Sequence, residues 1–158
     1  MKKIKLTQGK YAMIDDEDYE RVSQYRWFAA RNNDKSVFYA GRTIDKKNLG
    51  MHRFVLNVSD RRIKVDHINH NTLDNRKFNL RVCSHAENCS NRKPVKGRLL
   101  PKGVIAIGKN KYKAQIKKAG KDIHLGYFDS PIEAALAYNK KALELFGEFA
   151  YLNKIEGI

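Results

Sequence analysis

A short stretch near the middle of the chain holds side chains suited to acid–base and metal chemistry. Asp66 and His67 are adjacent at the end of a short apolar run that reads as a strand, and a loop rich in Asn and Asp follows. Residues 80–82 predict a second strand, and residues 84–87 have the spacing of a helix capping box, which places Asn88 near a helix start. This order of strand, loop, strand and helix would bring Asp66, His67 and Asn88 close to one point.

The residue types at this point indicate one kind of reaction. The Asp66 carboxylate and the Asn88 carboxamide offer hard oxygen ligands, which suit Mg²⁺ or Mn²⁺. A neutral His67 imidazole beside such a metal could accept a proton from an attacking water near neutral pH. Base and metal together predict a site that cleaves phosphodiester bonds.

Other readings of the histidines stay open. An isolated Asp-His pair at a strand end is more often a surface pair than a catalytic one. The presence of Asn79 and Asn88 at the spacing described here favours a catalytic site over a surface pair. His70 could be a second metal ligand. Its position in a polar loop favours a solvated side chain or one that contacts a phosphate. His85 lies in the first turn of the predicted helix, where a structural role is favoured, and His52 suits packing and substrate contact equally.

Residues 52–91 resemble the ββα-metal core of the HNH endonucleases, in the branch found in phage and intron-borne homing enzymes. The matching positions are Asp66-His67, Asn79 and Asn88. The resemblance implies that His67 is the general base and that Asp66 and Asn88 hold one divalent metal, Mg²⁺ or Mn²⁺. It also implies that Asn79 pins the loop by bonding to backbone near His67.

Composition indicates the kind of partner. The chain has 158 residues and a formal net charge of +15, so nucleic acid is the expected polyanion. No apolar run reaches membrane-spanning length and no signal-peptide core is present, so we expect a cytoplasmic protein of a bacterial host or phage-infected cell. Cys83 and Cys89 are the only cysteines, and they predict neither a Cys₄ zinc site nor a disulfide.

The chain divides into four expected segments. Residues 1–50 form a β-rich leader, residues 51–92 the nuclease core beginning with a short helix over 51–58, and residues 93–101 a basic linker. From residue 92 to residue 121 the chain carries eleven Lys or Arg and no Asp or Glu, which favours a phosphate-facing surface over a merely solvated one.

Residues 102–153 form the fourth segment. Residues 103–107, 111–117 and 122–126 predict three antiparallel strands, and a helix is expected from its N-cap at Ser130 to its stop at Gly147. Polar and basic residues alternate with apolar ones along the middle strand, so one sheet face would be basic and the other would pack on the helix.

This segment resembles an AP2/ERF DNA-binding domain, through marks such as residues 112–116, 125–128, 133–138 and 147–153. In that family the three-stranded sheet lies in the major groove of DNA. Ile105 and Ile107 stand where plant members carry base-reading Arg, so we expect contacts to phosphates that position without specifying sequence. The expected DNA-binding residues of linker and sheet are Arg92, Lys93, Lys96, Arg98, Lys102, Lys109, Lys111, Lys113, Gln115, Lys117 and His124.

The sequence therefore predicts an α+β protein with a ββα-metal core, a β-rich leader and a three-stranded sheet packed on one helix. The predicted activity is metal-dependent hydrolysis of double-stranded DNA by a monomer that nicks one strand and needs no protein partner. A non-catalytic, sequence-specific DNA-binding regulator is the alternative. An RNA-binding protein ranks last, because no alternation of aromatic and basic residues of the RNA-stacking kind is present.

Overall fold

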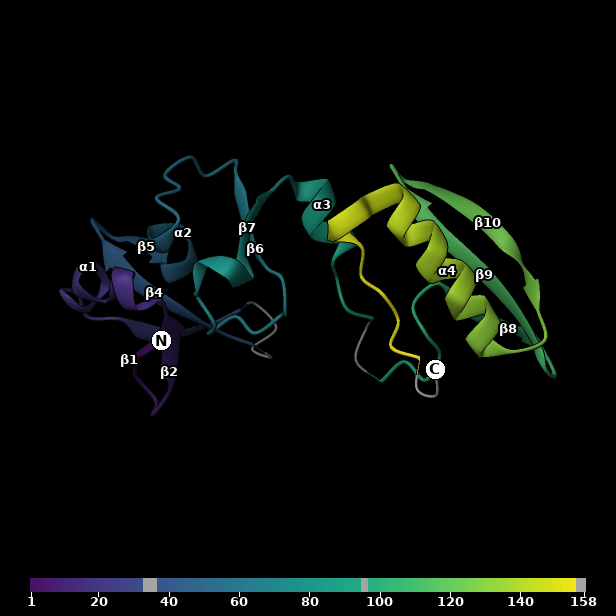
Figure 1. Cartoon of the computed structure of the whole chain (residues 1–158), viewed down its shortest axis with the longest axis horizontal. Helices are drawn as coiled ribbons and strands as arrows, with labels where there is room; N and C mark the ends of the chain where they lie inside the picture. The colour runs from purple at the N-terminus through teal and green to yellow at the C-terminus, as the bar shows by residue number, and fades with distance from the viewer. Residues whose placement is uncertain (33–36, 95–96, 156–158) are drawn as a thin grey trace. The chain divides into compact units, whose positions relative to one another are not determined.

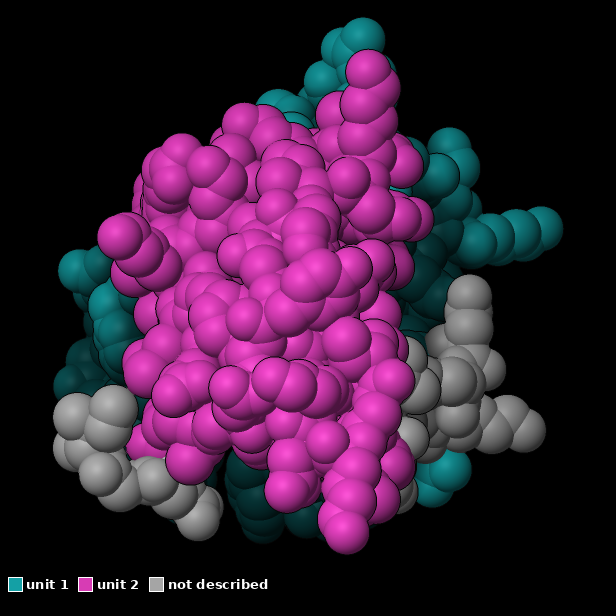
Figure 2. All heavy atoms as spheres, turned by 90° about the vertical axis from the view of Figure 1, so that its right-hand side faces the viewer, with its two compact units in different colours: residues 1–85 teal, residues 86–158 magenta. Residues whose placement is uncertain are grey.

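The computed structural model describes residues 1–32, 37–94 and 97–155. The chain divides into two compact units, Met1–His85 and Ala86–Ile158, which are coloured separately in Figure 2. Both contain small antiparallel sheets and helices, so the structure is mixed α and β and compatible with the predicted α+β class. Within the described ranges, no helix combines the length and the apolar character that crossing a membrane requires.

Unit 1 begins with two small sheets. Strands β1 (Lys2–Lys5) and β2 (Tyr11–Ile14) form a hairpin, and helix α1 (Tyr19–Ser23) follows a 3₁₀ turn. Strands β3 (Phe28–Arg31), β4 (Phe38–Ile44) and β5 (Lys47–Gly50) then form a three-stranded antiparallel sheet. Apolar residues from these elements form one buried core, which includes Ile4, Ala12, Ile14, Val22, Trp27, Ala29 and Ala40.

The second half of unit 1 adds a helix and a hairpin to this core. Helix α2 (Met51–Val55) is shorter than the predicted 51–58 and buries both of its end residues in the core. Strands β6 (Lys64–His67) and β7 (Leu80–Cys83) pair antiparallel around a long polar loop, and a 3₁₀ helix over Lys77–Asn79 leads into β7. Leu80 anchors this hairpin in the same core.

Unit 2 contains the C-terminal sheet. Strands β8 (Val104–Gly108), β9 (Lys111–Lys118) and β10 (Lys121–Phe128) pair antiparallel in the order β10-β9-β8. Helix α4 (Pro131–Phe146) lies across one face of this sheet (Figure 1), and its Ala134, Ala135 and Tyr138 are buried. The predicted helix limits are confirmed, because Ser130 accepts a hydrogen bond from the Ile132 N–H at 3.1 Å and Gly147 ends the helix at a φ of 52°.

The short helix α3 (His85–Ser90) follows β7 after a single residue, and the boundary between the units falls within it. Unit 1 thus holds the expected leader and most of the expected nuclease core. Unit 2 holds most of α3, the basic linker and the sheet segment.

Candidate active site and nucleic-acid interface

Strand β6 ends on the two residues that carry the predicted chemistry. Asp66 lies opposite Arg81 of β7 and His67 lies opposite Leu80, so the two residues point to opposite faces of the hairpin. Both side chains are buried, Asp66 with 9% and His67 with 4% of its surface exposed. The hairpin therefore removes a carboxylate and an imidazole from bulk water at adjacent positions.

The His67 imidazole has polar and aromatic neighbours. Its Nε2 lies 3.3 Å from Oδ1 of the fully buried Asn75, and its ring lies 5.3 Å from the ring of His52 and 6.1 Å from that of Tyr39. Burial lowers the pKa of His67 below its ordinary value, while the Asn75 contact and the charges of Asp66 and Asp74 oppose that shift. His67 is consequently a neutral imidazole at neutral pH, as a proton acceptor must be.

His52 is a packing neighbour of this imidazole. Burial is the main cause that lowers the pKa of His52 to about 3, and the neighbouring His67 and Arg53 disfavour a proton there further. Among the described residues its buried Nδ1 has no hydrogen-bond partner. A Cβ at Gly50 would lie 2.4 Å from the His52 ring, so only glycine leaves room for it. The sequence left the role of His52 open, and the structure favours packing.

Asp66 forms an ion pair with Arg81, a residue for which the sequence predicted no role. Arg81 donates to Asp66 Oδ2 from Nη2 at 2.9 Å and from Nε at 3.2 Å. Because Arg81 is the cross-strand partner of Asp66, only the pairing register of β6 and β7 reveals this ion pair. The guanidinium holds the carboxylate in a fixed orientation in a buried setting.

Asn79 joins the two ends of the loop between β6 and β7. Its Oδ1 accepts from the Asn69 N–H at 2.9 Å, and its Nδ2 donates to the Asp74 carbonyl at 2.8 Å. Asp74 is itself buried and paired with Arg76 through two hydrogen bonds of 2.7 and 2.6 Å. Asn79 is 1% exposed, so the loop after His67 closes on a buried carboxamide bonded to backbone on both sides.

Replacing Asn79 by Ala should destabilise unit 1 by about 1–3 kcal/mol, because it leaves a backbone donor and a buried backbone acceptor without partners. Urea unfolding followed by Trp27 fluorescence measures this change, since Trp27 is the only tryptophan and lies in the core of unit 1. Asn71→Ala is the matched control, because Asn71 is exposed in the same loop and caps only the Leu73 N–H. Equal losses for both variants would contradict the role given to Asn79.

The predicted second metal ligand, Asn88, lies in α3 and belongs to unit 2, whereas Asp66 belongs to unit 1. No cluster of three or more His, Cys, Asp or Glu side chains suited to a metal occurs in the part of the chain that the structure describes. The donor chemistry of the two side chains fits a hard cation.

The C-terminal sheet gathers several predicted DNA-binding side chains on one face. Lys113, Gln115 and Lys117 alternate along β9 with Ala114 and Ile116, which are buried on the side of α4. The predicted division into a polar, basic face and an apolar face is therefore confirmed for this strand.

Neighbouring strands complete this outward surface. In the pairing register, Lys113 lies between Ile105 of β8 and Tyr127 of β10, and Gln115 lies opposite His124. Tyr127 is 67% exposed and its ring lies 4.7 Å from that of His124. Asp122 of β10 lies opposite Lys117. The outer sheet face, as we name it, consists of Ile105, Lys113, Gln115, Lys117, Asp122, His124 and Tyr127.

The remaining predicted DNA-binding residues are placed differently. Arg92, Lys93 and Lys109 are exposed, and Lys111 is exposed but forms an ion pair with Asp129. Lys96 lies outside the described residues.

The side chains of Arg98 and Lys102 donate hydrogen bonds to backbone carbonyls of the protein itself. Arg98 Nη2 donates to the Val104 carbonyl at 2.5 Å. The Lys102 ammonium, a predicted phosphate contact, donates to the backbone carbonyls of Ser90 and Arg92.

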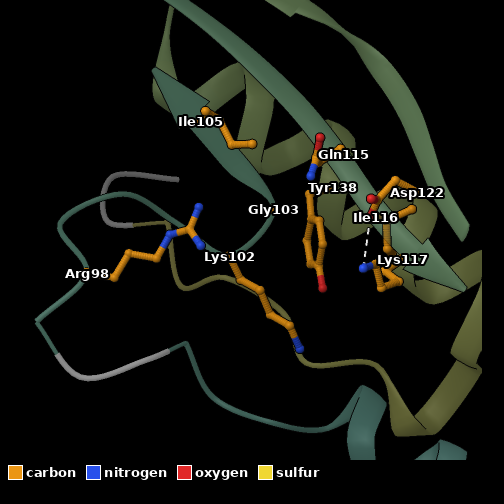
Figure 3. A pocket seen from close by; sticks show the side chains of 9 residues that line it. All are labelled: Arg98, Lys102, Gly103, Ile105, Gln115, Ile116, Lys117, Asp122 and Tyr138. Carbon is orange, nitrogen blue, oxygen red and sulfur yellow. Dashed lines mark ion pairs between the residues drawn. The ribbon is translucent and has the colours of Figure 1, made fainter. Parts of the chain in front are cut away.

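A pocket of about 220 Å³ lies beside β9 (Figure 3). Tyr138 of α4 lines it and is 3% exposed. Burial raises the pKa of Tyr138 to about 12, so the hydroxyl stays a proton donor. Arg98, Lys117 and Asp122 also line the pocket, with the Lys117 ammonium 3.8 Å from the Asp122 carboxylate, so its lining carries charges of both signs.

Comparison with known proteins gives one informative match. The chain is 33% identical over 156 residues to a protein of Acanthamoeba polyphaga mimivirus that is named an uncharacterised HNH endonuclease. The alignment covers 94% of this chain and 78% of the relative. No protein-family model matches the chain, and no solved structure matches it either.

Proposed function

Because this chain belongs to the HNH endonuclease family, we propose that it hydrolyses phosphodiester bonds of double-stranded DNA. In this proposal His67 is the general base, and Asp66 and Asn88 hold one Mg²⁺ or Mn²⁺. The observation that carries the proposal is the buried, neutral His67 at the end of β6, one residue from a carboxylate that is already oriented by Arg81.

In this proposal His67 and Asn79 have different roles in the reaction. In the tautomer that carries the His67 proton on Nε2, where Asn75 Oδ1 can accept it, the lone pair of Nδ1 would take the proton of the attacking water. Asn79 fixes the loop that follows His67 and thereby limits the movement of the base. A bound divalent metal would supply positive charge that stabilises the leaving oxygen.

DNA is held, in this proposal, by the C-terminal sheet, which would act as an AP2/ERF-like domain. The outer sheet face is basic and amphipathic, with Lys113 flanked by the apolar Ile105 and the exposed ring of Tyr127. The pocket below Gln115 and Lys117 would accept a backbone phosphate through the Tyr138 hydroxyl. Such contacts fix the position of the protein on DNA more than they specify sequence.

One such site per monomer predicts that supercoiled plasmid is converted first to the nicked circle, and that the reaction requires Mg²⁺ or Mn²⁺. Gel electrophoresis of timed samples with either metal and with EDTA measures both expectations. Linear product formed directly, without a nicked intermediate, would contradict single-strand cleavage. Activity that persists in EDTA would contradict the metal.

A non-catalytic DNA-binding regulator is the second candidate. The same plasmid experiment separates the two functions, since a regulator would bind duplex DNA without changing plasmid topology under any metal. The preserved set of Asp66, His67, Asn79 and Asn88 favours the nuclease.

A further inference from the structure

We propose that Lys102 is a positioning residue that holds α3, and with it Asn88, to the base of the C-terminal sheet domain. The role given to Asn88 rests on the proposed function, whereas the attachment of α3 rests on contacts within unit 2. In this inference Lys102 acts inside the protein rather than on a DNA phosphate.

The side chain of Lys102 is bound to the chain just after the helix. Its Nζ donates to the carbonyl of Ser90, the last residue of α3, at 2.9 Å and to the carbonyl of Arg92 at 2.7 Å. The last carbonyls of a helix lack intrahelical donors and carry partial negative charge, so an ammonium is a well-matched partner there. Tyr151 adds a cation–π contact at 5.1 Å from the Lys102 Nζ.

The backbone of Lys102 is bound in turn to the sheet domain. Its N–H donates to Asn153 Oδ1 at 2.7 Å, and its carbonyl accepts from Asn153 Nδ2 at 3.0 Å. Asn153 is 8% exposed and exchanges two further hydrogen bonds, of 2.8 and 2.9 Å, with the side chain of Asn139 on α4. We call Lys102, Asn153 and Asn139 the clamp, because these residues form a continuous polar connection from α3 to α4.

The helix needs such an attachment. α3 has six residues and none of them is fully buried, so its short length and its own packing give it little stability by themselves. The Lys102 side chain is half-buried and its ammonium contacts two carbonyls; this burial, with the nearby charge of Arg92, lowers the pKa of Lys102 to about 8. Because α4 also packs on the sheet that would bind DNA, the clamp lets that domain carry Asn88 with it.

Hydrogen–deuterium exchange of the full-length chain tests the clamp, using Lys102→Met, which keeps the apolar stem and removes the ammonium. We expect amides 85–92 to exchange at least about tenfold faster in this variant, since two charge-assisted bonds are lost. Affinity for a duplex oligonucleotide should stay within about twofold of the wild type, with the same salt dependence. Lys118→Met is the matched control, because Lys118 is exposed on β9 and makes no such contact.

A second readout connects the clamp to the metal. We expect Lys102→Met to raise the Mn²⁺ concentration needed for half-maximal plasmid nicking, and Lys102→Arg, which keeps several donors, to restore much of the wild-type behaviour. Unchanged exchange at residues 85–92, or a loss of DNA affinity with a smaller salt slope, would overturn the inference. If the wild type cuts no DNA, the proposed nuclease fails, while the exchange comparison still decides whether the clamp exists.

Discussion

Replacement of His67 by Ala is expected to lower metal-dependent nicking of duplex DNA by about 10²–10⁴-fold, the range over which a general base contributes. His67 follows Asp66 at the end of β6, and its Nε2 lies 3.3 Å from Oδ1 of the buried Asn75. Without it no side chain at this position accepts the proton of the attacking water. The rate of nicking at saturating Mg²⁺, measured on plasmid, gives the factor directly.

The experiment needs variants that separate chemistry from folding. His67→Asn keeps a polar side chain at this buried position and should fail in the same way as His67→Ala. Both His67 variants should bind duplex DNA as the wild type does, because the outer sheet face lies in the other unit. Nicking at the wild-type rate by His67→Ala would remove this residue from the role of base.

Most features of the hairpin formed by β6 and β7 could be predicted from the sequence. The strands predicted near residues 62–65 and 80–82 are found as β6 and β7, and Asn79 makes backbone bonds on both sides of the loop after His67. Local signals sufficed for these features, because apolar runs and turn-forming Asn residues act over a few positions. The Asp66–Arg81 pair was not predictable, since it depends on the register between two strands fifteen residues apart.

The C-terminal sheet shows where local patterns fail. Strict alternation would place Tyr127 and His124 on opposite faces, but a bulge between His124 and Gly126 shifts the register and brings both rings to the outer sheet face. Lys102 looks like one more cation of a basic run, yet its partners are carbonyls ten or more positions away in sequence. Strand β5 also went unpredicted, because Lys47–Gly50 has no alternating apolar pattern.

Removal of Lys111, Lys113 and Lys117 together, each replaced by Ala, is expected to weaken binding to duplex DNA and to flatten its salt dependence. Each lost phosphate contact should reduce the slope of log affinity against log salt by about 0.9. Lys113 should contribute most, because Lys111 is paired with Asp129 and Lys117 lies 3.8 Å from Asp122. Fluorescence anisotropy with a labelled duplex at several salt concentrations measures both affinity and slope.

The matched control for this triple variant removes the same charge elsewhere in unit 2. Lys140, Lys141 and Lys154 lie on α4 and in the C-terminal segment, so their replacement by Ala lowers the net charge equally without touching the outer sheet face. If net charge alone drives binding, both triple variants will lose the same slope, and the sheet is then not the interface. If the sheet docks on DNA, only the first variant loses slope, and its nicking returns when protein concentration is raised, because His67 and its loop are unchanged.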